Sequence, residues 1–338
     1  MEGTMERICI ISAYIGELPD TFPLWVKSVS ANQTVDFMLI TDKDVSPPPK
    51  NLRVIKKALF EIKRMAEQEL DMEVTLETPY KLCDFKPVFG KIFRRYLKDY
   101  NYDYWGHCDL DLIFGDLRFF FNKYGLNKYD KFLHQGHLAL YRNTERINNA
   151  YKLPGSYYYY KQVFTRNESF VFDEYNRING IFHYNHLPIF EEVIFANINP
   201  AFTRFKCCRI NNYSKQLFYY EKGKVFRAFI NHRGEVEKEE FIYIHLLGRK
   251  LDKVPVKVLK SEMFAITEDG YYVLHNQPSV SIIKQYTKNQ NRRTEYIEAA
   301  ANFKKRWLRI PAIKAHLSIA LWNYNIPRQI IMKRNYTE

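Results

Sequence analysis

The sequence has few cysteines, and none of them has the spacing of a metal-binding or redox motif. The count is odd, one pair is adjacent, and no C-x-x-C occurs among the five, which are Cys9, Cys83, Cys108, Cys207 and Cys208. This pattern excludes the disulfide framework of a small secreted domain and favours reduced thiols. We therefore expect a cytoplasmic protein.

Long apolar segments are also lacking. No apolar run reaches the roughly 18 residues that a membrane-spanning helix needs. Residues 1–7 (MEGTMER) carry acids and lead straight into an apolar run, which is not the pattern of a signal peptide. We expect a soluble chain, or one that at most lies on a membrane surface.

Motifs of nucleic-acid-binding modules and Gly-rich phosphate loops are absent too. The net charge of +13 favours anionic partners such as nucleotides, nucleic acid or acidic lipid. No zinc-finger spacing, RNA-recognition signature or long basic run occurs, so we expect no nucleic-acid partner. Neither G-x-x-x-x-G-K-[ST] nor G-x-G-x-x-G is present, which weighs against a nucleotidyltransferase or phosphotransferase.

The overall composition is that of a globular protein. Apolar residues make up 46% and charged residues 26% of 338 residues, enough for one large domain or two smaller ones. Aromatic residues reach 16%, including 26 Tyr and 25 Phe. A Tyr-rich surface suits sugars, whereas an AT-rich genome would enrich the same residue types without a function.

The first 120 residues alternate between strand-like and helix-like patterns. Short apolar runs predict strands over 7–13, 35–41 and 52–56, and amphipathic runs predict helices over 22–32 and 58–70. A further helix is expected over 84–99, with Asp84 as its cap, and then a strand that leads to Asp109. This order predicts an α/β domain with a mainly parallel sheet. Beyond residue 120 we expect short strands over 131–133, 138–141, 225–231 and 240–247.

Two aspartates follow the strand-like run of residues 102–108. In an extended segment, Asp109 and Asp111 would point the same way, and two carboxylates on one face repel each other. A hard divalent cation with oxygen ligands resolves this conflict, and such an ion takes its other ligands from water and substrate phosphates. The pattern D-x-D also occurs by chance on solvated loops, but the residues on both sides here are apolar or aromatic.

Five segments together resemble bacterial capsule and O-antigen polysaccharide glycosyltransferases of the GT-A type, which carry an Asp-x-Asp motif. The segments, in this order, are residues 80–90, 105–116, 136–143, 172–174 and 243–250. The resemblance runs from about residue 7 to about residue 255. It implies a GT-A-like single domain with a Rossmann-like, mainly parallel sheet. Within 1–280, residues 1–120 would form the nucleotide-sugar half and residues 121–280 the acceptor half.

The resemblance also implies how the donor and the metal are bound. The donor would be a nucleotide sugar, expected to be a UDP-sugar, held with Mn²⁺ or Mg²⁺. The metal ligands would be Asp109, Asp111 and His245, although a histidine in a half-buried strand is equally well explained by packing. Residues that would contact the donor are Ala13, Tyr14, Asp84, Lys86, Asp109, Arg249 and Lys250.

On the acceptor side, Asp173 or Glu174 would be the general base, an assignment that competes with a helix cap or a solvated pair. Gly136, His137, Tyr141 and Arg142 would lie across the cleft, beside the donor sugar or the acceptor. The sequence leaves open whether transfer inverts or retains the anomeric configuration.

The predicted function is metal-dependent transfer of a sugar to a saccharide or lipid-linked saccharide acceptor in surface polysaccharide synthesis. The alternatives are a nucleotidyltransferase or phosphotransferase with the same carboxylates, and a non-enzymatic carbohydrate-binding protein. Residues 285–338 form a C-terminal extension that is rich in Lys and Arg, with Trp307 and Trp322 among its apolar residues. This pattern predicts a basic amphipathic helix, which either lies on the anionic inner face of the cell membrane or packs on the domain.

Overall fold

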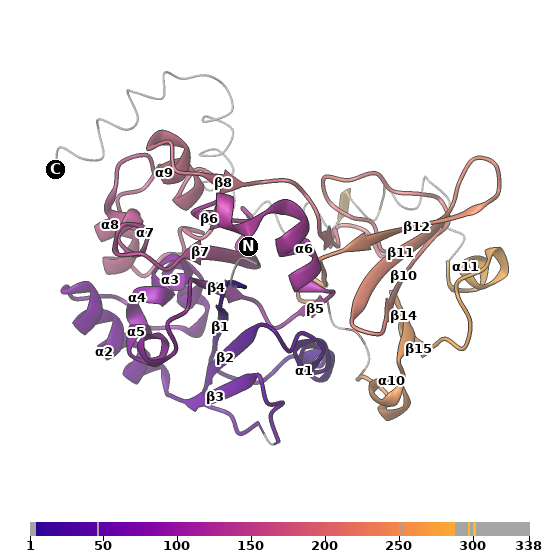
Figure 1. Cartoon of the computed structure of the whole chain (residues 1–338), viewed down its shortest axis with the longest axis horizontal. Helices are drawn as coiled ribbons and strands as arrows, with labels where there is room; N and C mark the ends of the chain where they lie inside the picture. Colours follow the sequence, from indigo (N-terminus) through magenta and orange to yellow (C-terminus); the bar gives the residue numbers. More distant parts are fainter. Residues whose placement is uncertain are drawn as a thin grey trace.

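The computed structural model describes residues 5–45, 47–249, 251, 253–287, 297 and 300–301. It contains three β-sheets, of seven, five and three strands. The five-stranded sheet lies to one side of the seven-stranded sheet, and the short strand β5 (Leu112–Phe114) lies between them (Figure 1). The fold is therefore a mixed α/β architecture, as expected.

The seven-stranded sheet is mainly parallel, which confirms the predicted sheet type. In the order β3-β2-β1-β4-β7-β6-β8, only the β4–β7 and β7–β6 pairs are antiparallel. Its strands are β1 (Ile8–Tyr14), β2 (Asp36–Thr41), β3 (Leu52–Lys56), β4 (Tyr104–Cys108), β6 (Lys131–Phe132), β7 (Leu138–Arg142) and β8 (Ile189–Phe190).

Helices cover both faces of this sheet, so its central strands are buried on both sides. On one face, Ile8 and Ile10 pack toward α1 (Phe22–Ala31) and α6 (Leu117–Tyr124). On the other face, Cys9 and Ile11 pack toward α2 (Leu59–Leu70) and residues 82–97. The alternation along β1 thus serves two separate cores.

The helix predicted over 84–99 is not continuous. The chain forms a series of short turns instead: η1 (Pro79–Lys81), α3 (Leu82–Phe85), η2 (Lys86–Val88), α4 (Phe89–Ile92), α5 (Arg94–Leu97) and η3 (Lys98–Tyr100). Pro87 has no N–H for an interior helical hydrogen bond. Gly90 lies against the Trp105 ring, which a Cβ atom would meet at 2.1 Å. Asp84 is buried within this series and does not cap a long helix.

The second half of the chain builds an antiparallel sheet in the order β12-β11-β10-β14-β15. Its strands are β10 (Gln216–Glu221), β11 (Lys224–Ile230), β12 (Val236–Phe241), β14 (Met263–Thr267) and β15 (Gly270–Val273). Helix α11 (Val280–Tyr286) packs on β10 and β11, and α10 (Val256–Lys260) lies near α1 and β15. The strand predicted over 225–231 corresponds to β11.

The strand predicted over 240–247 divides between two sheets. Its first part belongs to β12, and the remainder forms β13 (Tyr243–His245), which pairs with β5 (Leu112–Phe114) and β9 (Ala196–Asn197). The resulting three-stranded sheet has the order β5-β13-β9. It brings the segment after Asp111 beside the segment that ends at His245.

The remaining helices lie between β7 and β8: α7 (Glu145–Asn148), η5 (Ala150–Lys152), α8 (Tyr160–Thr165) and α9 (Ile178–Tyr184). The short helix η4 (Leu126–Lys128) precedes β6.

All five cysteines are free. Among the described helices, none combines the length and the apolar character needed to cross a bilayer. Beyond Thr287 only residues 297, 300 and 301 are described, so the predicted amphipathic helix lies almost entirely outside the described residues.

Candidate active site

The two aspartates lie in the bend that joins β4 to β5, not along a strand. The backbone N–H of Asp109 donates to the carbonyl of His137 (3.0 Å), next to β7. The carbonyl of Asp111 accepts from the N–H of Leu246 (3.0 Å), just after β13. The bend is therefore fixed at one end to the seven-stranded sheet and at the other to the three-stranded sheet.

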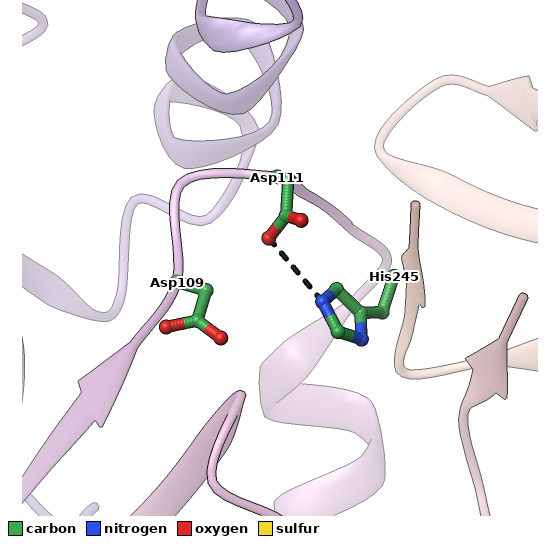
Figure 2. A group of neighbouring side chains, drawn as sticks. All are labelled: Asp109, Asp111 and His245. Atoms are coloured by element: carbon green, nitrogen blue, oxygen red, sulfur yellow. Dashed lines mark ion pairs between the residues drawn. The ribbon is translucent and has the colours of Figure 1, made fainter. Parts of the chain in front are cut away.

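His245 joins the aspartates because of strand register. It is the last residue of β13 and pairs with Leu112, the residue after Asp111. Figure 2 shows the side chains of Asp109, Asp111 and His245 directed toward a common space. One ligand atom from each lies within 4.8 Å of the other two. Two carboxylates and an imidazole form a donor set that fits a divalent cation such as Mn²⁺.

Neighbouring groups orient two of these side chains. The Gly248 N–H donates to Asp111 Oδ2 (2.6 Å), and Asp111 Oδ1 lies 3.3 Å from His245 Nε2. Burial of Asp111 opposes its ionisation, but His245 and the Gly248 N–H outweigh it and lower the pKa of the carboxyl group. On the other side of the imidazole, His245 Nδ1 lies 3.0 Å from Oδ1 of Asn197, a residue that the sequence did not identify.

A buried ammonium group connects the cluster of Asp109, Asp111 and His245 to a third carboxylate. Lys86 Nζ lies 2.6 Å from Asp109 Oδ1 and 3.2 Å from Asp173 Oδ2, and it donates to the Gly136 carbonyl (2.9 Å). Burial alone would lower the pKa of Lys86, but Asp109 and Asp173 raise it well above its usual value. Lys86 therefore stays charged.

For Asp173, burial affects the pKa more than the neighbouring charges do, which is the reverse of the case of Lys86. Burial raises its pKa to about 7, although Lys86 opposes this shift and Glu174 and Asp109 add to it. The neighbouring Glu174 is held by the backbone, since the Gly136 N–H donates to its Oε1 atom (2.9 Å). Asp173 thus has a pKa suited to accepting a proton near neutral pH.

Asp84, expected at the nucleotide, instead anchors the segment that carries Asp173. It is fully buried, and its carboxylate accepts from the N–H groups of Phe170 (3.0 Å) and Phe172 (2.9 Å). Lys81 Nζ lies 2.9 Å from Asp84 and donates to the carbonyls of Val163 (2.8 Å) and Glu168 (2.6 Å). Asp84 lines neither of the cavities described next.

Two cavities meet at the cluster. The larger, of about 720 Å³, is lined by Asp109, Asp111, His245, Asp173 and Glu174 among others. The smaller, of about 300 Å³, lies at the carboxyl end of β1. Both are lined by Tyr80, Cys83, Lys86 and Asp109.

The residues expected at the donor fall into three groups. Ala13 and Tyr14 line the smaller cavity, and Lys86 lines both. Arg249 lines neither, because its guanidinium donates to the carbonyls of Asn199 and Thr203 (both 2.9 Å) and of Phe202. Lys250 lies outside the described residues.

The residues expected at the acceptor are also divided. Gly136 lies directly beneath Asp173, and His137 lines the larger cavity with its Nδ1 atom 2.8 Å from the Tyr243 hydroxyl. Burial lowers the pKa of His137 well below its usual value, so its imidazole is neutral.

Tyr141 and Arg142 are not at the cleft. Tyr141 is buried and stacks on Trp105, with 4.6 Å between the ring centroids. Arg142 Nε lies 2.9 Å from Asp130 Oδ1, and the guanidinium also donates to the carbonyls of Asn127 and Tyr129. Neither residue lines either cavity.

Among the solved structures that the chain matches is a galactosyltransferase, LgtC, in complex with donor and acceptor sugar analogues. That match has 12% sequence identity and a TM-score of 0.33, and it covers 57% of this chain and 76% of LgtC. No curated protein matches the sequence. A model described as a family of unknown function (DUF6625) matches residues 10–275, and the chain belongs to this family.

Proposed function

We propose that the protein is a metal-dependent glycosyltransferase that moves a sugar from a nucleotide-sugar donor, expected to be a UDP-sugar, to a saccharide acceptor. One observation carries this proposal. Asp109, Asp111 and His245 converge where the two cavities meet, and Lys86 connects Asp109 to Asp173. Donor binding needs a place for the nucleoside and a cation at the diphosphate, and an inverting transfer also needs a base for the acceptor hydroxyl.

The smaller cavity suits the nucleoside. Its lining is largely apolar, and Tyr14 and Tyr80 supply aromatic rings on which a base can stack. It lies at the carboxyl end of a central parallel strand, where α/β sheets commonly bind ligands. The diphosphate would then extend toward Asp109, and the sugar into the larger cavity.

Asp109, Asp111 and His245 would hold the cation. When bound, a divalent cation neutralises the charge that develops on the departing diphosphate. The imidazole ligand favours Mn²⁺ over Mg²⁺, because Mg²⁺ prefers an all-oxygen set. Gly248 and Asn197 keep Asp111 and His245 oriented before any ligand arrives.

Asp173 would act as the general base in an inverting reaction. Its carboxylate takes the proton from the acceptor hydroxyl while that oxygen bonds to the sugar C1 atom. The bond between C1 and the diphosphate oxygen breaks, and the nucleoside diphosphate leaves with the electron pair. Lys86 fixes the carboxylate, and Glu174 fixes Gly136 beside it.

The biological setting proposed is surface polysaccharide synthesis on the cytoplasmic side of the cell membrane. A lipid-linked acceptor would account for a basic amphipathic extension at residues 285–338, through attraction to anionic lipid. Flotation of the full chain with anionic vesicles at low salt is the expected result. Failure to float would remove the membrane part of the proposal and leave the chemistry untouched.

The activity is tested by incubating the protein and Mn²⁺ separately with UDP-, GDP- and CDP-sugars. We expect release of one nucleoside diphosphate, slowly to water and faster when acceptor sugars are added. Release of a nucleoside monophosphate together with a sugar 1-phosphate would show cleavage between the two phosphates and would point to a phosphotransferase or nucleotidyltransferase instead. No release with any donor would contradict the proposal.

A further inference from the structure

His245 has one exchangeable ring proton when neutral, and two oxygen atoms lie close enough to accept it. Nδ1 lies 3.0 Å from Oδ1 of Asn197, and Nε2 lies 3.3 Å from Oδ1 of Asp111. Both oxygens are acceptors only. The ring can therefore donate a hydrogen bond to only one of these oxygens. The ring nitrogen that carries no proton is the one that can bind a metal ion.

Asn197 is held in place independently of its side chain. It pairs with His245 in the parallel register of β9 and β13, so the two side chains lie next to each other on one face of the sheet. The N–H of Ile198 donates to the His245 carbonyl (3.0 Å), and the N–H of Cys208 donates to the Asn197 carbonyl (2.8 Å). The amide oxygen is thus presented to Nδ1 by fixed backbone.

Asp111 competes for the same proton from the opposite side. Its Oδ2 atom is occupied by the Gly248 N–H, which leaves Oδ1 facing Nε2. A proton on Nε2 would satisfy this carboxylate but would block Nε2 as a ligand. The contact to Asn197 is the shorter of the two, which favours the proton on Nδ1.

We infer that Asn197 is a positioning residue, which fixes the His245 tautomer that carries its proton on Nδ1 and presents Nε2 to a divalent cation. This inference rests on the cation site of the proposed function. The side chain of Asn197 acts only through His245. Outer partners of this kind typically contribute about 10- to 100-fold to metal affinity.

The test compares Mn²⁺ binding by wild type, Asn197→Leu and Asn197→Asp, measured by titration in the absence of donor and acceptor. Leu preserves the approximate size but removes the acceptor, whereas Asp keeps an acceptor oxygen. We expect the Kd of Asn197→Leu to rise about 10- to 100-fold. Asn197→Asp should bind at least as tightly as wild type. A packing role would not depend on the acceptor oxygen, so Asn197→Leu would then bind Mn²⁺ about as tightly as wild type.

The ¹⁵N chemical shifts of His245 in the metal-free protein provide the second measurement. Wild type should carry the proton on Nδ1, and Asn197→Leu should move it to Nε2. A proton on Nε2 in wild type, or an unchanged Kd in Asn197→Leu, would overturn the inference while the cation site stands. If wild type binds no Mn²⁺ at all, the cation site itself is refuted, and the inference with it.

Discussion

The ammonium group of Lys86 lies 2.6 Å from the carboxylate of Asp109, and the same nitrogen lies 3.2 Å from Asp173. One buried cation thus connects a candidate metal ligand to the candidate base. Because Lys86 and Asp109 line both cavities and Asp173 lines the larger one, a change at Lys86 should affect both halves of the proposed reaction.

Lys86→Met should raise the pH that transfer requires. Without the ammonium group, the pKa of Asp173 rises further above its value of about 7, because Lys86 is what lowers it. Activity at pH 7 should fall at least tenfold and recover partly at higher pH. The measurement is the pH dependence of kcat/KM, and a variant with the wild-type pH profile would contradict the connection.

In the wild-type protein, the ionisation of Asp173 predicts how activity and stability change with pH. Activity should decline as pH falls through about 7, since the protonated carboxyl cannot act as a base. The folded-state pKa is raised, so this group's contribution to stability is full below its unfolded pKa and is lost as pH rises through about 7.

Asp173→Asn separates the two effects, because it has no such titration. It should be inactive at every pH, yet more resistant to urea than wild type at pH 8, with a difference that shrinks toward pH 4. Equal urea midpoints for the two proteins at pH 8 would mean that burying the ionised Asp173 carboxylate does not destabilise the fold.

Gly136 cannot carry a side chain without moving the base. A Cβ atom at this position would lie 2.2 Å from Asp173 Oδ2 and 2.8 Å from Glu174 Cγ. Gly136→Ala should therefore displace Asp173 and lower kcat by about 100-fold, the order of loss that misplacement near the chemistry causes. Mn²⁺ binding should persist, because Gly136 is not a metal ligand, and retained kcat would show that the carboxylate can move without loss.

The buried pair of Lys81 and Asp84 should matter for stability more than for ligand contact. Lys81→Met would leave the Asp84 carboxylate buried without its cation, which typically costs about 3–5 kcal/mol. Urea unfolding measures this loss. The double variant Lys81→Met with Asp84→Asn should recover part of it, and a double variant no more stable than Lys81→Met would argue against the unpaired charge as the cause.

The central strands could be predicted from local sequence because burial on both faces requires continuous apolar runs. The observed β1 and β2 agree with the predicted 7–13 and 35–41 to within one residue. The 84–99 segment was mispredicted because its form depends on distant partners: Asp84 binds the N–H groups of Phe170 and Phe172. No pattern in the sequence around Asp84 predicts these hydrogen bonds to Phe170 and Phe172.

Residues in the candidate site differ in the same way. Asp109 and Asp111 could be identified from the local sequence, because two acidic residues within an apolar run are unusual and a divalent cation would account for them. Asn197 has no such signal, since its importance comes from the register of β9 beside β13. Arg142 had a plausible position in sequence, but its side chain turns to Asp130 and away from the cavities.

The most direct test of the account is the thermal unfolding of wild type and Asp111→Asn with UDP, GDP and CDP, each with and without Mn²⁺. The account predicts that one nucleotide, expected to be UDP, raises the wild-type Tm by several degrees only when Mn²⁺ is present. Asp111→Asn, compared with its own Tm without ligands, should lose this shift. Equal nucleotide-dependent shifts with and without Mn²⁺, or an undiminished shift in Asp111→Asn, would contradict a metal-dependent nucleotide-sugar site at Asp109, Asp111 and His245.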